Sequence, residues 1–344
     1  MLLRLLTTLA VASLLLSGCA VGRAGQPEWN DPEVKLVWPE APAEPRVAYL
    51  RSVSVQNIRE GRKGTSGRLF QWLTGQDAPV QPLAQPYGLA ADGAGRIWVA
   101  DPGSQALYIF DLARGAVDYW TTAGDKALVS PAGVAVARER NRVFISDSVA
   151  GRVAVLDLSG HWLADLQPRR PFQRPAGMAI GPAGRLYVVD VLGGRVEVFS
   201  PDLEPVRTIR GHDAAGFNHP TAVAVADDGR VYIVDGMNFR VEVQDADGDF
   251  LGYIGKLGDT PGTFARPRGV ALDSQGHVYV SDAAFDNVQV FDREGRLLMY
   301  LGQPGKGPGQ FCLPAGLFAD GDDRLYVVDS CNFRVQIFQY LGGG

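Results

Sequence analysis

From residue 86 onward, short apolar runs recur along the chain, most of them followed by a run that alternates polar and hydrophobic positions with a period of two. Examples are Leu186-Tyr-Val-Val-Asp190 and Val231-Tyr-Ile-Val-Asp235, both rich in β-branched and aromatic residues and both ending in aspartate. This composition and alternation predict β-strands. A second type of run, Arg240-Val-Glu-Val-Gln, follows after a short gap and predicts the next strand of the same sheet.

The strand pattern belongs to a unit that occurs six times. Each unit begins with a segment close to Pro-x-Gly-hydrophobic-Ala, at Pro86, Pro131, Pro175, Pro220, Pro267 and Pro314. Successive prolines lie 45, 44, 45, 47 and 47 residues apart. Four antiparallel strands in a repeat of this length are typical of a propeller blade. The sequence therefore predicts an all-β, six-bladed β-propeller over residues 46–344.

The last repeat ends after its third strand, near Tyr340. The segment from Arg46 to Leu50 matches the fourth strand that this repeat lacks. We expect residues 46–58 to supply that strand and close the ring, because free sheet edges invite aggregation. Residues 59–85 then connect the closing strand to the first repeat. Four apolar residues in this connector are expected to form a short turn over one end of the ring: Leu69, Phe70, Trp72 and Leu73.

The N-terminus reads as a targeting segment. Arg4 precedes an apolar run from Leu5 to Leu16, which is short for a membrane span and typical of a signal peptide. The end of the run, Leu16-Ser-Gly-Cys19, resembles the lipobox of bacterial lipoproteins. That resemblance implies removal of residues 1–18 and lipidation of Cys19, with Ala20 favouring the outer membrane. Residues 19–45 contain five prolines and predict an extended tether.

The repeat unit resembles the NHL repeat over residues 86–340. The matching elements are Pro-x-Gly-hydrophobic-Ala, Gly-Arg-hydrophobic-Tyr-Val-x-Asp and Asn-x-Arg-Val-x-hydrophobic-Phe, the last close to Asn332-Phe-Arg334. Together with the lipobox, this is similar to bacterial six-bladed NHL lipoproteins. The resemblance implies a fold, and function has to be argued from a site.

Composition narrows the choice of partners. The net charge is −5 and the pI is about 5.5, so nothing in the overall charge attracts a phosphate backbone and nucleic acid is excluded as a partner. The expected contacts are the membrane, through the lipid anchor, and a protein, peptide or glycan of the cell envelope. We expect a monomeric propeller.

An aspartate ends the second strand of every blade. Four of these aspartates are followed five residues later by an arginine, which predicts structural pairs across the turn. The pairs are Asp147 with Arg152, Asp190 with Arg195, Asp235 with Arg240, and Asp329 with Arg334. Asp101 and Asp282 lack the arginine, so they are the weak candidates for a metal ligand.

Residues that differ between blades are the better guide to function. Blades three to five carry basic residues beside the repeat proline: Arg174, His219, Arg266 and Arg268. Tyr87 holds the corresponding place in blade one, and these five residues form the candidate ligand face. An anionic ligand or acidic peptide is the predicted occupant. The alternative is a solvated rim with no ligand.

Cys312 and Cys331 fall on adjacent strands at the same end of blade six, which predicts a disulfide in a compartment outside the cytosol. Two reduced thiols are the alternative.

The four histidines show neither metal-ligand spacing nor a base next to a nucleophile. No catalytic residue is assigned and no cofactor is expected. The sequence favours a binding or scaffolding module over an enzyme. The rival interpretation is a metal-dependent hydrolase or lyase, similar to propeller lactonases or amidating lyases, with Ca or Zn in the central channel.

Overall fold

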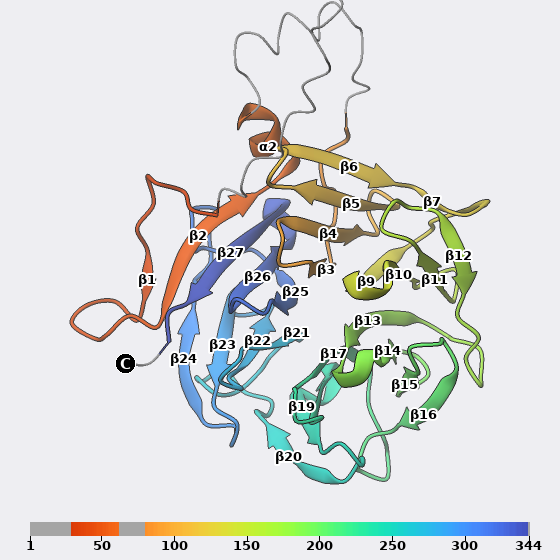
Figure 1. Cartoon of the computed structure of the whole chain (residues 1–344). Coiled ribbons are helices and arrows are strands. Elements are labelled where there is room, and N and C mark those ends of the chain that lie inside the picture. The colour runs from red at the N-terminus through yellow and green to blue at the C-terminus, as the bar shows by residue number, and fades with distance from the viewer. Residues whose placement is uncertain (1–28, 62–79, 343–344) are drawn as a thin grey trace, which may run out of the picture.

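The computed structural model describes residues 29–61 and 80–342. They form six antiparallel sheets arranged around a central channel (Figure 1), and the predicted all-β propeller is confirmed. Five blades consist of four consecutive strands, which follow one another from the channel outward. Blade one contains β3 (Gly88–Ala91), β4 (Arg96–Asp101), β5 (Ala106–Asp111) and β6 (Ala116–Trp120). Blade two contains β9 (Pro131–Ala137), β10 (Arg142–Asp147), β11 (Arg152–Leu156) and β12 (Trp162–Asp165).

Blades three to five repeat this order. Blade three contains β13 (Pro175–Ile180), β14 (Leu186–Asp190), β15 (Arg195–Phe199) and β16 (Pro205–Ile209). Blade four contains β17 (Pro220–Val225), β18 (Val231–Asp235), β19 (Arg240–Gln244) and β20 (Phe250–Ile254). Blade five contains β21 (Pro267–Leu272), β22 (Val278–Asp282), β23 (Asn287–Phe291) and β24 (Leu297–Leu301).

Blade six combines both ends of the described chain. Its inner strands are β25 (Pro314–Ala319), β26 (Arg324–Asp329) and β27 (Arg334–Tyr340), and its fourth strand is β2 (Val47–Val53). β2 pairs antiparallel with β27, from Val47 opposite Tyr340 to Val53 opposite Val335. In Figure 1 the orange β2 lies directly beside the blue β27. The predicted closure of the ring by an N-terminal strand is therefore confirmed.

The described part of the segment expected as an extended tether over residues 19–45, from Trp29 onward, lies against blade six. β1 (Val37–Trp38) adds a fifth strand to blade six beside β2. The guanidinium carbon of Arg324 lies 3.8 Å from the Trp29 ring centroid, and Leu36 packs against the same blade. The apolar residues between the prolines are few, but they are enough to dock this N-terminal arm.

The remaining elements are short. A helix, α2 (Val55–Gly61), follows the closing strand, and β7 (Thr122–Ala123) pairs with β8 (Lys126–Ala127). Four 3₁₀ turns complete the described chain: η1 (Arg138–Arg140), η2 (Pro182–Gly184), η3 (Gly236–Asn238) and η4 (Ser330–Asn332). The signal peptide, Cys19 and the apolar residues predicted to form a turn, Leu69, Phe70, Trp72 and Leu73, lie outside the described residues.

The core lies between neighbouring blades. Trp98 of blade one and Val143 of blade two, for example, share one buried cluster. The inner strands meet closely, and the third residue of the repeat is glycine in five of the six blades, with Ala222 in blade four. A Cβ on Gly316 would lie 2.6 Å from the carbonyl oxygen of Tyr87 in the next blade, and the Gly316 N–H donates to that oxygen at 2.9 Å. The glycine therefore permits a narrow ring around the channel.

Candidate functional site

The site lies where the inner strands begin. In blades two to six the inner strand starts at the repeat proline, and this proline is the register partner of the aspartate that ends the second strand, as in Pro175 with Asp190. In blade one the inner strand starts two residues after the proline, at Gly88. Both features therefore lie on one face of the disk. The residue after the proline projects at the mouth of the channel on that face. It is small in blades two, three and six, and large only in blades one and five, where it is Tyr87 and Arg268.

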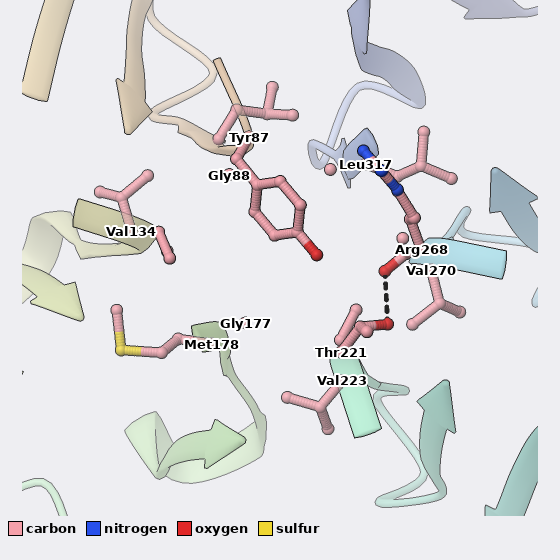
Figure 2. Close-up of a pocket in the computed structure, with 16 residues that line it drawn as sticks. Tyr87, Gly88, Val134, Gly177, Met178, Thr221, Val223, Arg268, Val270 and Leu317 are labelled. Carbon is pink, nitrogen blue, oxygen red and sulfur yellow. Dashed lines mark hydrogen bonds between the residues drawn. The ribbon is translucent and has the colours of Figure 1, made fainter. Parts of the chain in front are cut away.

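Tyr87 and Arg268 meet over the mouth. The guanidinium carbon of Arg268 lies 5.8 Å from the centroid of the Tyr87 ring, a distance at which a cation is attracted to the face of an aromatic ring. Figure 2 shows the Tyr87 ring reaching over the opening, with Val134, Met178 and Leu317 around it. The cavity volume is about 40 Å³ at this mouth and about 250 Å³ in the channel below it.

The charges at the mouth act on one another. Burial raises the pKa of the Tyr87 hydroxyl, and three positive charges oppose the rise: Arg268, Arg174 and Arg266. Burial lowers the pKa of Arg268, and the like charge of Arg266 lowers it further. Arg174 and Arg266 are exposed. Within residues 29–61 and 80–342, no carboxylate pairs with any of these three arginines. Among the described residues, the mouth is thus a basic site whose arginines have no carboxylate ion-pair partner.

The repeat aspartates hold the backbone of these basic residues in place. Asp190 accepts the Arg174 N–H at 2.8 Å, and Asp282 accepts the Arg266 N–H at 3.1 Å. His219 is exposed on the same rim, with its Nδ1 2.9 Å from Asn218 Oδ1. The structure therefore brings the predicted residues Arg174, Arg266, Arg268 and Tyr87 to one mouth and places His219 at its edge.

The six repeat aspartates are fully buried and act as structural acceptors. Three of the predicted arginine pairs are present: Asp190 with Arg195 at 2.9 Å, Asp235 with Arg240 at 3.4 Å, and Asp329 with Arg334 at 2.7 Å. The predicted pair of Asp147 and Arg152 is wrong. Arg152 pairs with Asp165 at 3.2 Å, because blade two offers that carboxylate on its neighbouring fourth strand.

Asp101 and Asp282 are not freer than the other repeat aspartates. Asp101 accepts the N–H groups of Ala84, Gln85 and Ser104. Asp282 accepts those of Ala265, Arg266 and Ala284. Their carboxylates, like the others, are used to fold the loops between blades. Across the described part of the chain, no cluster of three His, Cys, Asp or Glu side chains could hold a metal ion.

The channel below the mouth offers backbone rather than reactive side chains. The inner strands are paired on one side only, so each presents an edge of N–H and C=O groups toward the channel. The side chains along this stretch are aliphatic or aromatic, as at Val136, Ile180 and Leu272. A channel of this kind holds water or accepts hydrogen-bonding groups.

Cys312 and Cys331 form a disulfide in the structure, with their Cα atoms 5.4 Å apart. The Cys331 N–H also donates to the Cys312 carbonyl at 3.1 Å, and the Cys312 N–H to Asp329 Oδ1 at 2.8 Å. The bridge therefore ties the first strand of blade six to its turn beside the mouth.

One unusual residue was not predicted as part of a site. His277 precedes the second strand of blade five, at a position where each of the other five repeats has an arginine: Arg96, Arg142, Arg185, Arg230 and Arg324. The repeat alignment contains this signal. The difference is found only when the six repeats are compared at every position, including positions away from the repeat proline.

Comparison with known families supports the repeat assignment. The NHL repeat model matches residues 264–291 and 311–338, so the chain carries NHL repeats on a six-bladed propeller. No curated protein matches the chain. The described residues contain no helix that is long and apolar enough to cross a membrane.

Several solved structures share the fold at low sequence identity. A catalytically inactive virginiamycin B lyase from Staphylococcus aureus, solved with quinupristin, is 14% identical with a TM-score of 0.56, covering 74% of this chain and 95% of that one. A gluconolactonase from Xanthomonas campestris is 16% identical with a TM-score of 0.57, covering 75% and 86%. An auxiliary nutrient binding protein from Bacteroides thetaiotaomicron is 15% identical with a TM-score of 0.58, covering 76% and 70%. At these identities the likeness concerns the fold alone.

Proposed function

We propose that this protein is a non-enzymatic binding or scaffolding module of the cell envelope, anchored at the outer membrane through lipid on Cys19. Its basic mouth receives an anionic group of a protein, peptide or glycan partner. The observation that carries the proposal is the partly buried Arg268 over Tyr87, flanked by Arg174 and Arg266, with no carboxylate paired to these arginines in the described residues. A desolvated cation of this kind gains from an external anion.

The rival function is a hydrolase or lyase with a metal in the channel. Two of the similar folds are a lyase and a gluconolactonase, and a third is a nutrient binding protein, so fold alone favours neither function. The chemistry of the described residues favours binding, because the repeat carboxylates already accept backbone N–H groups and the channel side chains are apolar. Elemental analysis of the purified protein separates the two, since stoichiometric Ca or Zn would support the enzyme.

The binding proposal is tested by recovery of partners from detergent-solubilised envelopes. Wild-type protein is compared with the double variant Arg266→Ala/Arg268→Ala. The matched control is Arg138→Ala/Arg140→Ala, which removes two exposed arginines from the opposite face of the disk. We expect the same partner with wild type and control, and its loss with the mouth variant. Equal recovery with all three proteins would refute the role of the mouth.

A further inference from the structure

A second pocket lies far from the mouth, on the outer flank of blade five. It is formed between the outer strands of blade five on one side and blade six with its N-terminal arm on the other, and it has a volume of about 480 Å³. Its apolar wall includes Val47, Val290, Leu298 and Met299, and its polar groups include Arg46 and His277. The arm docks at a single place on the ring, so no other blade of the described structure has this combination of walls.

His277 is the unusual residue of this pocket. Its five counterparts are arginines, so the propeller fold does not demand a histidine there. Two arginine counterparts pair with the aspartate four residues earlier: Arg96 with Asp92 at 2.9 Å and Arg324 with Asp320 at 2.8 Å. His277 keeps the same pairing with Asp273. The substitution therefore preserves the structural contact and replaces a permanent charge by a group that titrates.

The imidazole is held in a fixed orientation. Its Nδ1 lies 2.8 Å from Asp273 Oδ2, which also accepts the Tyr279 hydroxyl at 2.8 Å. The ring packs edge-on against Tyr340, with centroids 5.2 Å apart. With Nδ1 engaged, Nε2 is the nitrogen left without a partner among the described residues, and 22% of the side chain is exposed. The hydrogen bond that the His277 Nδ1–H donates to Asp273 raises the pKa of His277.

The second polar group is the Arg46 guanidinium. Its bonds are long, at 3.4 Å both to Glu44 and to the Gly342 carbonyl, and 38% of the side chain is exposed. Arg46 and protonated His277 each have one carboxylate partner, Glu44 and Asp273. Above an aliphatic and aromatic wall, these two cations suit a molecule with one carboxylate and an apolar body. The size also fits, because cavities of about 150 Å³ already accept benzene and ligand pockets usually measure about 300–1,000 Å³.

We propose that this flank pocket binds a small monocarboxylic acid with an aromatic or branched aliphatic body. The carboxylate accepts a hydrogen bond from protonated His277 Nε2, with Arg46 at the rim, and the apolar body packs on Leu298, Met299 and Val47. This site is independent of the mouth and of the function proposed for it.

The proposal makes binding depend on pH. A carboxylate binds the imidazolium more tightly than the neutral ring, so affinity falls as pH rises through the pKa of His277. The charged or titratable groups around the ring come from every neighbouring element: Asp273, Tyr279, Asp292, Arg293, Tyr340, Glu44 and Arg46. Among them, His277 is the group expected to titrate near neutral pH.

The test is titration calorimetry of the folded protein with benzoate, 2-naphthoate and 4-methylpentanoate, using 2-naphthamide as the uncharged control. We expect carboxylate binding that weakens from pH 5.5 to pH 8 and amide binding that does not change. His277→Gln is expected to weaken carboxylate binding at pH 5.5 at least tenfold, since a charge-assisted hydrogen bond is lost. The matched control is His161→Gln, because His161 makes the same contact with Asp157, at 3.0 Å, in blade two.

Two further variants keep the test decisive. Leu298→Glu, at a position 51% exposed, places a like charge in the pocket and should abolish carboxylate binding without affecting the fold. His277→Arg restores the residue of the other repeats and should bind carboxylates with no change between pH 5.5 and pH 8. The proposal is overturned if none of the three acids binds with a Kd below 5 mM, or if the Kd values for His277→Gln and Leu298→Glu equal those for wild type.

Discussion

Gly316 lies at the seam between blade six and blade one, directly beside the backbone of Tyr87. An alanine there would place its Cβ 2.6 Å from the Tyr87 carbonyl oxygen and 3.1 Å from the Cα of Gly88. Ordinary contact begins near 3.4 Å, so the two strands must separate by about 0.8 Å, the difference between 3.4 and 2.6. Both obstacles are backbone atoms, so no side-chain rotation can relieve the clash.

The same separation breaks a hydrogen bond. If the strands move directly apart, the Gly316 N–H to Tyr87 O distance grows from 2.9 Å to roughly 3.7 Å, beyond hydrogen-bonding range. Overpacking costs about 1–3 kcal/mol and the lost bond about 1 kcal/mol. We therefore expect Gly316→Ala to lower the free energy of unfolding by about 2–4 kcal/mol, a fall of roughly 3–6 °C in Tm for a propeller of this size.

The assay is thermal unfolding followed by circular dichroism. Gly321→Ala is the matched control in the same blade, because a Cβ on Gly321 meets nothing within 4 Å and its φ is not positive. That variant should stay within about 0.5 kcal/mol of wild type. If Gly316→Ala melts at the same temperature as Gly321→Ala, the close approach of the inner strands is not the reason for the repeat glycine.

Three further predictions concern stability. Reducing the bond between Cys312 and Cys331, 19 residues apart, should cost about 3 kcal/mol in the chain-entropy model; an unchanged Tm with reductant would argue against the bond. Burial raises the pKa of the Glu242 carboxyl, so the folded protein binds this proton more tightly than the unfolded chain does. The free energy of unfolding therefore falls as pH rises from the pKa in the unfolded chain, about 4.3, through the higher pKa in the folded protein. Glu242→Gln should match wild type below pH 4 and exceed it at pH 7 in urea unfolding, and the reverse order would contradict the assignment. Tyr49 is 5% exposed and packs 5.7 Å from the Phe338 ring, so Tyr49→Ala should lose about 3–5 kcal/mol; a loss below 1 kcal/mol would mean that the closing strand contributes little.

The features that all blades share could be predicted from the sequence, because the same sequence pattern occurs six times. Strand order, blade number and ring closure follow from spacing and alternation alone. The turn pair of Asp147 and Arg152 was predicted wrongly, because the choice between Asp147 and Asp165 depends on which carboxylate the fourth strand brings near. The docking of Trp29 was missed for a similar reason, since its partner Arg324 lies at the far end of the chain.

The candidate site was predicted in part. The basic residues beside the prolines could be placed on one face by register, but the contact of Arg268 with Tyr87 depends on the small Ala315 in the intervening blade. The flank pocket needs the N-terminal arm docked on blade six beside blade five, which no local pattern indicates. Sites made by segments distant in sequence are the part that single-sequence reasoning misses.

The closing of blade six by β2 has a consequence for connectivity. Because the Leu341 N–H donates to the Arg46 carbonyl at 2.8 Å, the two chain ends of the propeller meet at one seam. A short linker across it would circularise the ring, and new termini could be opened at an exposed turn such as Asp247-Gly248. In such a permuted chain blade six would be covalently continuous across the present seam, and the strands next to the new termini would be β19 and β20, so peeling of a terminal strand would move from blade six to blade four.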